Sequence, residues 1–136
     1  MGHIYAEITV RPSADSAKSW TGRALVDTGA TDTFVPGREL RKLGIKPVGK
    51  RLYELADGTV EELPIAVGAV EILGNPAGAT LVFAGDDDEP LLGVTVLESA
   101  GFWIDPENER LIPRTPKRKR RLSLFSTPTT NGCRES

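Results

Sequence analysis

Cysteine is almost absent from this sequence of 136 residues, because the one cysteine is Cys133, close to the C-terminal end. A lone cysteine cannot form a disulfide within the chain, which favours a reducing compartment. The first ten residues lack the basic and apolar segments of a signal peptide. No apolar run approaches the length that spans a membrane. We therefore expect a soluble, cytoplasmic protein with no membrane partner.

A large net charge is also lacking, since 17 Lys and Arg stand against 19 Asp and Glu. The two signs are unevenly spread, however. Residues 113–136 hold seven basic side chains and one acid, a charge of +6, which leaves −8 on residues 1–112. An acidic body of this kind is not a nucleic-acid-binding domain as a whole, and the basic run at 117–121 is the one candidate for such a contact.

The composition divides the chain into two regions. Residues 1–112 alternate between apolar and polar side chains and are long enough to bury a core as one domain. From residue 113 onward Pro, Ser, Thr and basic residues dominate, and such a segment has little to bury. We expect a folded domain over 1–112 and a disordered basic tail over 113–136.

Helical periodicity is scarce, and most segments follow the two-residue period of strands. Hairpins are predicted where residues 4–10 meet 20–27, around Asp57-Gly58, and at 102–113. A turn is predicted at 74–78, followed by a buried strand at 79–85. Short helices are predicted at 37–44 and 94–101, each closed by a glycine. The pattern indicates a mainly β fold.

One segment, ALVDTGATDTFVP at residues 24–36, places an acid at the end of a strand that otherwise has the composition of a core strand. Asp-Thr-Gly by itself is common in ordinary turns. Here an apolar strand precedes Asp27, and Phe34-Val35-Pro36 follow it. Farther along, Leu91-Leu92-Gly93 leads into a predicted helix.

In this combination and order, residues 1–112 resemble the retropepsin-like (clan AA) aspartic proteases, specifically the small cellular type found in prokaryotes. The shared order is N-terminal strand, Asp-Thr-Gly loop, hairpin flap, buried strand, apolar-apolar-Gly, helix and final strands. The resemblance implies the retropepsin-like acid-protease fold. That fold is a closed, barrel-like half-lobe of strands with a flap hairpin and one or two short helices, and it is homodimeric.

The resemblance also implies an aspartic endopeptidase that hydrolyses peptide bonds in extended polypeptides and needs no cofactor or metal. Two carboxylates held together can share one proton, so that one activates a water and the other protonates the substrate. The sequence supplies one Asp-Thr-Gly, and no second matching acid follows an apolar strand. The catalytic pair is therefore expected to be Asp27 from each of two subunits.

Further roles follow from the same resemblance. Thr28, Gly29 and Ala30 are expected to form the active-site loop, with Thr28 bonding across the two-fold axis. The flap and its substrate contacts are expected from Ala56, Asp57, Gly58 and Thr59. Support beneath the active-site loop is expected from Leu91, Leu92 and Gly93.

The sequence departs from the viral members of the family at two linked positions. Those members form an ion pair from an acid two residues after the active-site glycine and an arginine directly after the later glycine. This chain has Thr31 and Val94 at these positions. Both charges are missing together, so no lone buried charge results, and the dimer must gain its stability elsewhere.

Several alternatives remain open from the residues alone. A dimeric peptide-binding module of the same fold, without catalysis, is the first, and a nucleic-acid-associated protein acting through its tail is the second. Residues 86–89 are expected to form a solvated acidic turn rather than a calcium loop, because the metal-loop spacing is absent. Residues 122–126, with the sequence LSLFS, are a candidate self-cleavage site.

Overall fold

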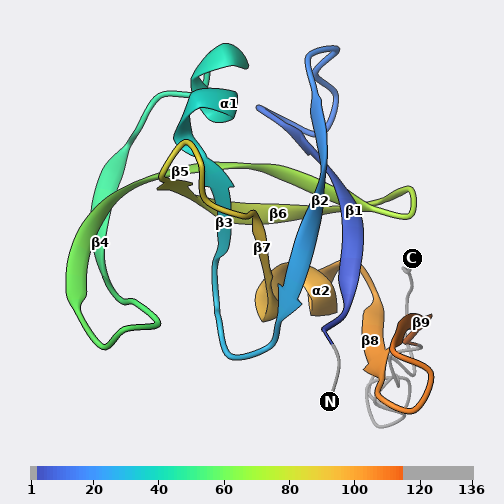
Figure 1. Cartoon of the computed structure of the whole chain (residues 1–136). Helices are drawn as coiled ribbons and strands as arrows, with labels where there is room; N and C mark the ends of the chain where they lie inside the picture. The colour runs from blue at the N-terminus through green and yellow to red at the C-terminus, as the bar shows by residue number, and fades with distance from the viewer. Residues whose placement is uncertain (1–2, 115–136) are drawn as a thin grey trace, which may run out of the picture.

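The computed structural model describes residues 3–114, over which nine strands and two short helices follow one another (Figure 1). The elements are β1 (Tyr5–Arg11), β2 (Trp20–Asp27), β3 (Thr33–Pro36), α1 (Gly37–Lys42), β4 (Gly49–Glu54), β5 (Val60–Ile72), β6 (Asn75–Ala84), β7 (Leu91–Gly93), α2 (Val94–Ser99), β8 (Phe102–Asp105) and β9 (Arg110–Pro113).

Seven of these strands form one sheet in the order β1-β2-β7-β3-β6-β5-β4. A further pairing of β1 with β5, from Ile8↔Ile72 to Arg11↔Ala69, joins the two sides of the sheet. This pairing closes a barrel, and β4 remains outside it as an extension of β5. The predicted mainly β, barrel-like fold is confirmed.

The core lies inside the barrel, where the predicted alternation decides which side chains enter. On β1, Ile8 and Val10 are fully buried, whereas the intervening Thr9 is only partly buried. Burying such side chains stabilises the fold by roughly 1.5–3 kcal/mol each. Within residues 3–114, Thr33 is the one polar side chain that is buried.

The β5–β6 connection corrects the sequence analysis, because the predicted turn at 74–78 is wrong. The turn consists of Leu73 and Gly74 alone, with φ angles of 51° and 85°, and Ile72 already pairs with Asn75. Two left-handed residues are what the tightest antiparallel hairpins require. Pro76 has no N–H to donate to a neighbouring strand. It is tolerated in β6 because β3 pairs with β6 only from Leu81 onward, so the side of β6 away from β5 is unpaired at Pro76.

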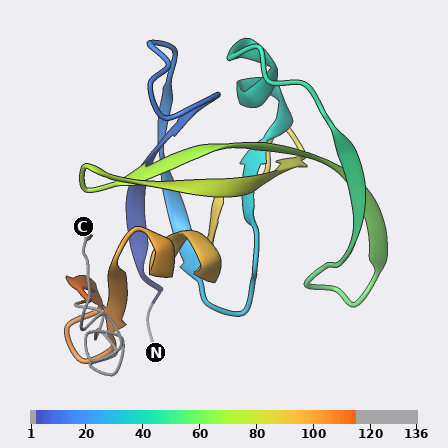
Figure 2. The same cartoon turned by 180° about the vertical axis from the view of Figure 1, so that it is seen from behind.

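The β4–β5 hairpin extends away from the barrel, as Figures 1 and 2 show from opposite sides. Its turn contains Asp57 and Gly58, as predicted, and Gly58 has a φ angle of 88°. The tip of the hairpin and the loop from β2 to β3 lie toward the same end of the molecule in both views.

The chain ends its described part in a separate two-stranded sheet of β8 and β9, which lies beside α2. Its hairpin confirms the predicted turn after Asp105. The Arg114 N–H donates to the Gly101 carbonyl at 2.7 Å. The predicted tail beyond residue 114, with the basic run 117–121, the 122–126 site and Cys133, lies outside the described residues. None of the helices within 3–114 is long and apolar enough to cross a membrane.

Candidate active site

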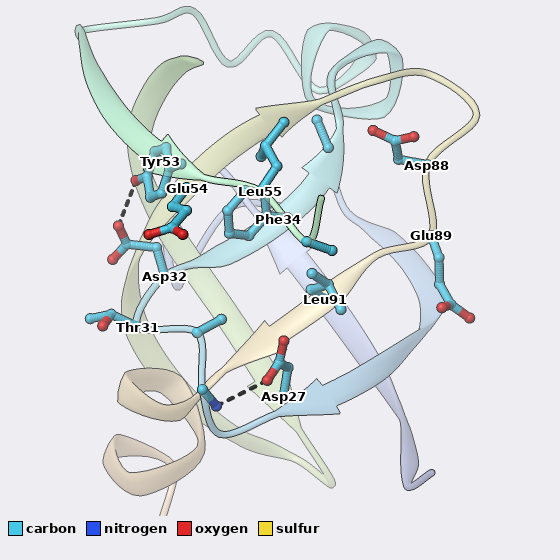
Figure 3. Close-up of a pocket in the computed structure, with 14 residues that line it drawn as sticks. Asp27, Thr31, Asp32, Phe34, Tyr53, Glu54, Leu55, Asp88, Glu89 and Leu91 are labelled. Atoms are coloured by element: carbon cyan, nitrogen blue, oxygen red, sulfur yellow. Dashed lines mark hydrogen bonds between the residues drawn. The ribbon is translucent and has the colours of Figure 1, made fainter. Parts of the chain in front are cut away.

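Asp27 is the last residue of β2, at the point where two parallel strands end together. Its backbone pairs with Gly93 at the end of β7. The strand that leads to it is apolar because β2 lies in the closed sheet, with Ala24 fully buried. The side chain of Asp27 is half-buried and points into a groove (Figure 3).

Backbone amides of the following loop fix the orientation of Asp27. The Gly29 N–H donates to Asp27 Oδ1 at 2.9 Å, and the Ala30 N–H donates to the Asp27 carbonyl at 3.1 Å. A Cβ at Gly29 would lie 3.2 Å from Asp27 Oδ1, so a larger residue would crowd the carboxylate. Thr28 is exposed and does not line the groove.

The segment Leu91-Leu92-Gly93 lies directly against this loop. Leu92 is fully buried, and Leu91 lines the groove. The Gly93 N–H donates to the buried Thr33 hydroxyl at 3.1 Å. One residue on, the Val94 N–H donates to the Ala30 carbonyl at 2.8 Å. These bonds tie the start of α2 to the loop that follows Asp27.

The groove has a volume of about 740 Å³ and lies between the Asp27 loop and the β4 arm of the β4–β5 hairpin. Figure 3 shows apolar side chains across its middle and Asp27 at one end. Its lining residues are Asp27, Gly29, Ala30, Thr31, Asp32, Phe34, Tyr53, Glu54, Leu55, Ala56, Ala84, Asp88, Glu89 and Leu91.

The residues predicted for the flap separate into two groups. Ala56 lines the groove, whereas Asp57, Gly58 and Thr59 form the turn beyond it. Asp57 Oδ1 accepts bonds from the Thr59 hydroxyl at 2.6 Å and the Thr59 N–H at 3.0 Å. These bonds favour the charged carboxylate and lower the pKa of Asp57 below its ordinary value.

A second acid in the groove, Asp32, escaped the sequence analysis. Its Oδ2 accepts a hydrogen bond from the Tyr53 hydroxyl at 2.6 Å and forms an ion pair with Arg51 at 2.8 Å. Burial, followed by the bond to Asp32, raises the pKa of Tyr53 to about 12. The hydrogen bond to Asp32, followed by its charge, raises the pKa of Arg51. Asp32 therefore connects the loop after Asp27 to the hairpin strand β4.

The acidic loop before β7 makes one hydrogen bond to the start of α1 and one within the loop. Asp86 accepts a bond from the Arg38 N–H at 2.9 Å, and Asp88 accepts one from the Gly85 N–H at 2.9 Å. Between residues 3 and 114, no three His, Cys, Asp or Glu side chains are grouped so that they could hold a metal ion.

Comparisons with known proteins agree with this geometry. The family model described as gag-polyprotein putative aspartyl protease matches residues 18–99. The solution structure of a simian foamy virus protease superposes with a TM-score of 0.50 at 20% sequence identity. That match covers 69% of this chain and 91% of the viral one, and it shows a shared fold. No curated protein matches the sequence significantly.

Proposed function

Because this chain belongs to the gag-polyprotein putative aspartyl protease family, which is retropepsin-like, we propose that it is an aspartic endopeptidase whose catalytic acid is Asp27. The observation that carries the proposal is the position of Asp27. It ends a strand of the closed sheet, is oriented by the Gly29 amide, and faces a groove about 740 Å³ in volume.

One subunit supplies half of the chemistry, so the proposed enzyme is a homodimer with two Asp27 side chains sharing one proton. The ionised carboxylate takes a proton from a water, and the water oxygen attacks the peptide carbonyl carbon. The protonated carboxyl group gives its proton to the carbonyl oxygen, which forms a diol. A diol hydroxyl then returns a proton to the carboxylate that is now ionised, the other carboxyl group protonates the nitrogen, and the carbon–nitrogen bond breaks to release an acid and an amine. The pair ends in the protonation state in which it began.

The groove suits an extended polypeptide as substrate. Phe34, Leu55 and Leu91 give it apolar walls beside Asp27. A strand-like peptide lying beneath the β4–β5 hairpin offers backbone groups for hydrogen bonds, as in other cases of strand addition. The hairpin is the proposed flap, which excludes water from the reaction. The proposed location is the cytoplasm, whose reducing conditions suit a chain with one cysteine.

The test is hydrolysis of an unfolded protein substrate between about pH 3 and 7, a range in which a carboxylate pair titrates. Wild type is expected to cleave, and Asp27→Asn is expected to lose all cleavage while remaining folded. Asp15→Asn is the matched control, because Asp15 lies on the exposed loop between β1 and β2, away from the groove.

Two outcomes contradict the proposal. If Asp27→Asn cleaves as fast as wild type, the acid is elsewhere. If folded wild type binds peptides in the groove but does not hydrolyse them, the chain is a dimeric peptide-binding module. In the second case, a calorimetric titration of folded wild type with the uncleaved substrate measures whether the peptide binds.

A further inference from the structure

The lining of the groove has a one-sided charge. Five of its residues are acids, and none of those within the described part of the chain is Lys, Arg or His. One of these acids, Asp27, is the proposed catalytic acid. The other four raise the question of which substrate side chains they accept.

The four acids differ in how far they are already neutralised. Asp32 is paired with Arg51 at 2.8 Å, and Asp88 accepts the Gly85 N–H at 2.9 Å. Glu54 and Glu89 are exposed, and among residues 3–114 neither carboxylate has a hydrogen-bond or ion-pair partner. Their charges are therefore available to a ligand.

The acids lie on both sides of an apolar middle. Figure 3 shows Glu54 beside Asp32 on one side and Asp88 with Glu89 on the other. The side chains of Phe34, Leu55 and Leu91 lie between the two sides. A peptide crossing the groove would meet apolar surface near Asp27 and negative charge to either side.

We propose that the groove selects extended polypeptides that carry lysine or arginine close to an apolar residue at the cleavage point, and that Glu54 and Glu89 determine this preference. The inference rests on the proposed function, since it assigns the substrate class of the same groove. Opposite charges attract a basic side chain into place, whereas an acidic one would be repelled. In a homodimer each half-groove repeats, so both sides of the cleaved bond would be flanked by acids.

This chain contains a peptide of the proposed class. Residues 117–126 read KRKRRLSLFS, five basic side chains followed by an apolar segment. The segment is outside the described residues, but its sequence provides the natural probe. The charge of the tail, +6 against −8 on the body, makes it complementary to the domain that precedes it.

The experiment compares two synthetic peptides as substrates of the full-length protein. One has the sequence of residues 115–126, and the other has Gln in place of its five Lys and Arg residues. The readout is the ratio of kcat/KM for the basic peptide to kcat/KM for the neutral one. Binding of both labelled peptides to Asp27→Asn is measured in parallel, so that selection is tested without turnover.

Wild type is expected to prefer the basic peptide, and Glu54→Gln/Glu89→Gln to lose most of the preference. Each exposed charge is expected to change the ratio by up to about fivefold. The control Asp15→Asn/Asp87→Asn removes two acids that do not line the groove, and it should keep the wild-type ratio. The ratio should also fall as salt rises from about 0.01 M to about 1 M, because salt screens exposed charges.

Equal cleavage and equal binding of the two peptides by wild type overturn the inference. A preference that survives in Glu54→Gln/Glu89→Gln overturns the assignment to these residues. If no substrate is cleaved but Asp27→Asn and wild type both bind the basic peptide more tightly, the proposed function fails and the charge selection stands. If wild type cleaves an unfolded protein and rejects the basic peptide, the proposed function stands and the inference fails.

Discussion

At the scale of single residues, Asp32 connects the two walls of the groove. Its side chain is 10% exposed, and the Arg51 that pairs with it is 50% exposed. A carboxylate with so little contact with solvent needs partners, because an isolated charge that is largely withdrawn from water is costly. Tyr53 and Arg51 supply them from β4, 21 and 19 residues farther along the chain. The cluster of Asp32, Arg51 and Tyr53 thus holds one arm of the proposed flap against the loop after Asp27.

The first prediction concerns the titration of Tyr53. Burial, with the bond to Asp32, raises its pKa to about 12, above the ordinary value of 10.0. A raised pKa means that the neutral phenol stabilises the fold, fully below pH 10, and that this contribution is lost as the pH rises towards 12. The difference in phenolate absorbance between wild type and Tyr53→Phe, followed as the pH is raised, should have its midpoint near 12. In Asp32→Asn the midpoint should fall only in part, because burial is the larger cause.

Urea unfolding provides the second readout of that prediction. Between pH 10 and about 12 the wild type should lose stability relative to Tyr53→Phe, which has no phenol to titrate. A Tyr53 midpoint at the ordinary 10.0 would contradict the account.

The sequence identified Asp27 but not Asp32, for a physical reason. Asp27 belongs to a local pattern, a strand followed by Thr28-Gly29, and that pattern is visible in one stretch. The role of Asp32 depends on β4 folding back over it, a contact that no local period encodes. Arg51 and Tyr53 are two residues apart on β4 and so share one face of the strand, but this spacing does not identify the acid that they reach.

At the scale of elements, the short strand β7 holds the site together. It pairs in parallel with β2 and also contacts β3 through Leu91 and Phe34. A Cβ added at Gly93 would lie 2.6 Å from the Thr31 carbonyl oxygen and closer still to that of Asp32. Glycine is required here for close packing of two backbones.

The second prediction is therefore that Gly93→Ala destabilises the protein and displaces the Asp27 loop. The overpacking should cost roughly 1–3 kcal/mol in the free energy of unfolding, measured in urea. Gly78→Ala is the control, because a Cβ at Gly78 meets nothing within 4 Å. If Gly93→Ala were as stable as Gly78→Ala, β7 would not support the loop in this way.

Hairpins and short helices were predictable at this scale, because each is specified by neighbouring residues. Asp57-Gly58 marked the β4–β5 turn, and Gly44, with a φ angle of 80°, marked the end of α1. The β5–β6 turn was predicted at the wrong residues because Leu73 adopts a left-handed conformation that leucine rarely takes. The parallel pairings β2–β7 and β3–β6 join distant segments and leave no sign in the periodicity.

At the scale of the whole molecule, the described fold contains one Asp27, which is half of the catalytic pair that we propose. The closed barrel leaves one Asp27 facing the groove, and the β8–β9 hairpin lies apart from the barrel sheet. Trp103 on β8 is 42% exposed, with Arg114 over its ring at 6.0 Å. Because this hairpin exposes an aromatic side chain outside the barrel sheet, we propose that it contributes to the dimer interface.

The third prediction follows from that proposal. Hydrolysis should rise faster than linearly with protein concentration, because active dimers must first assemble. Trp103→Ser should shift this rise to higher concentration by about tenfold or more, as expected for an aromatic residue that carries much of an interface. Val67→Ser is the matched control, since Val67 is 68% exposed on β5. Sedimentation should show weaker dimerisation for Trp103→Ser than for Val67→Ser. If Trp103→Ser is not shifted, the hairpin is not part of the interface.

The measurement that tests the central claim most directly is inhibition of wild type by its own Asp27→Asn variant. When subunits exchange freely, an about ninefold excess of variant leaves about one tenth of the wild-type subunits paired with one another. If the acid is shared, activity per wild-type subunit should fall towards that fraction as the mixture equilibrates. Activity that stays constant at every ratio would show that each subunit acts alone, and it would contradict the account.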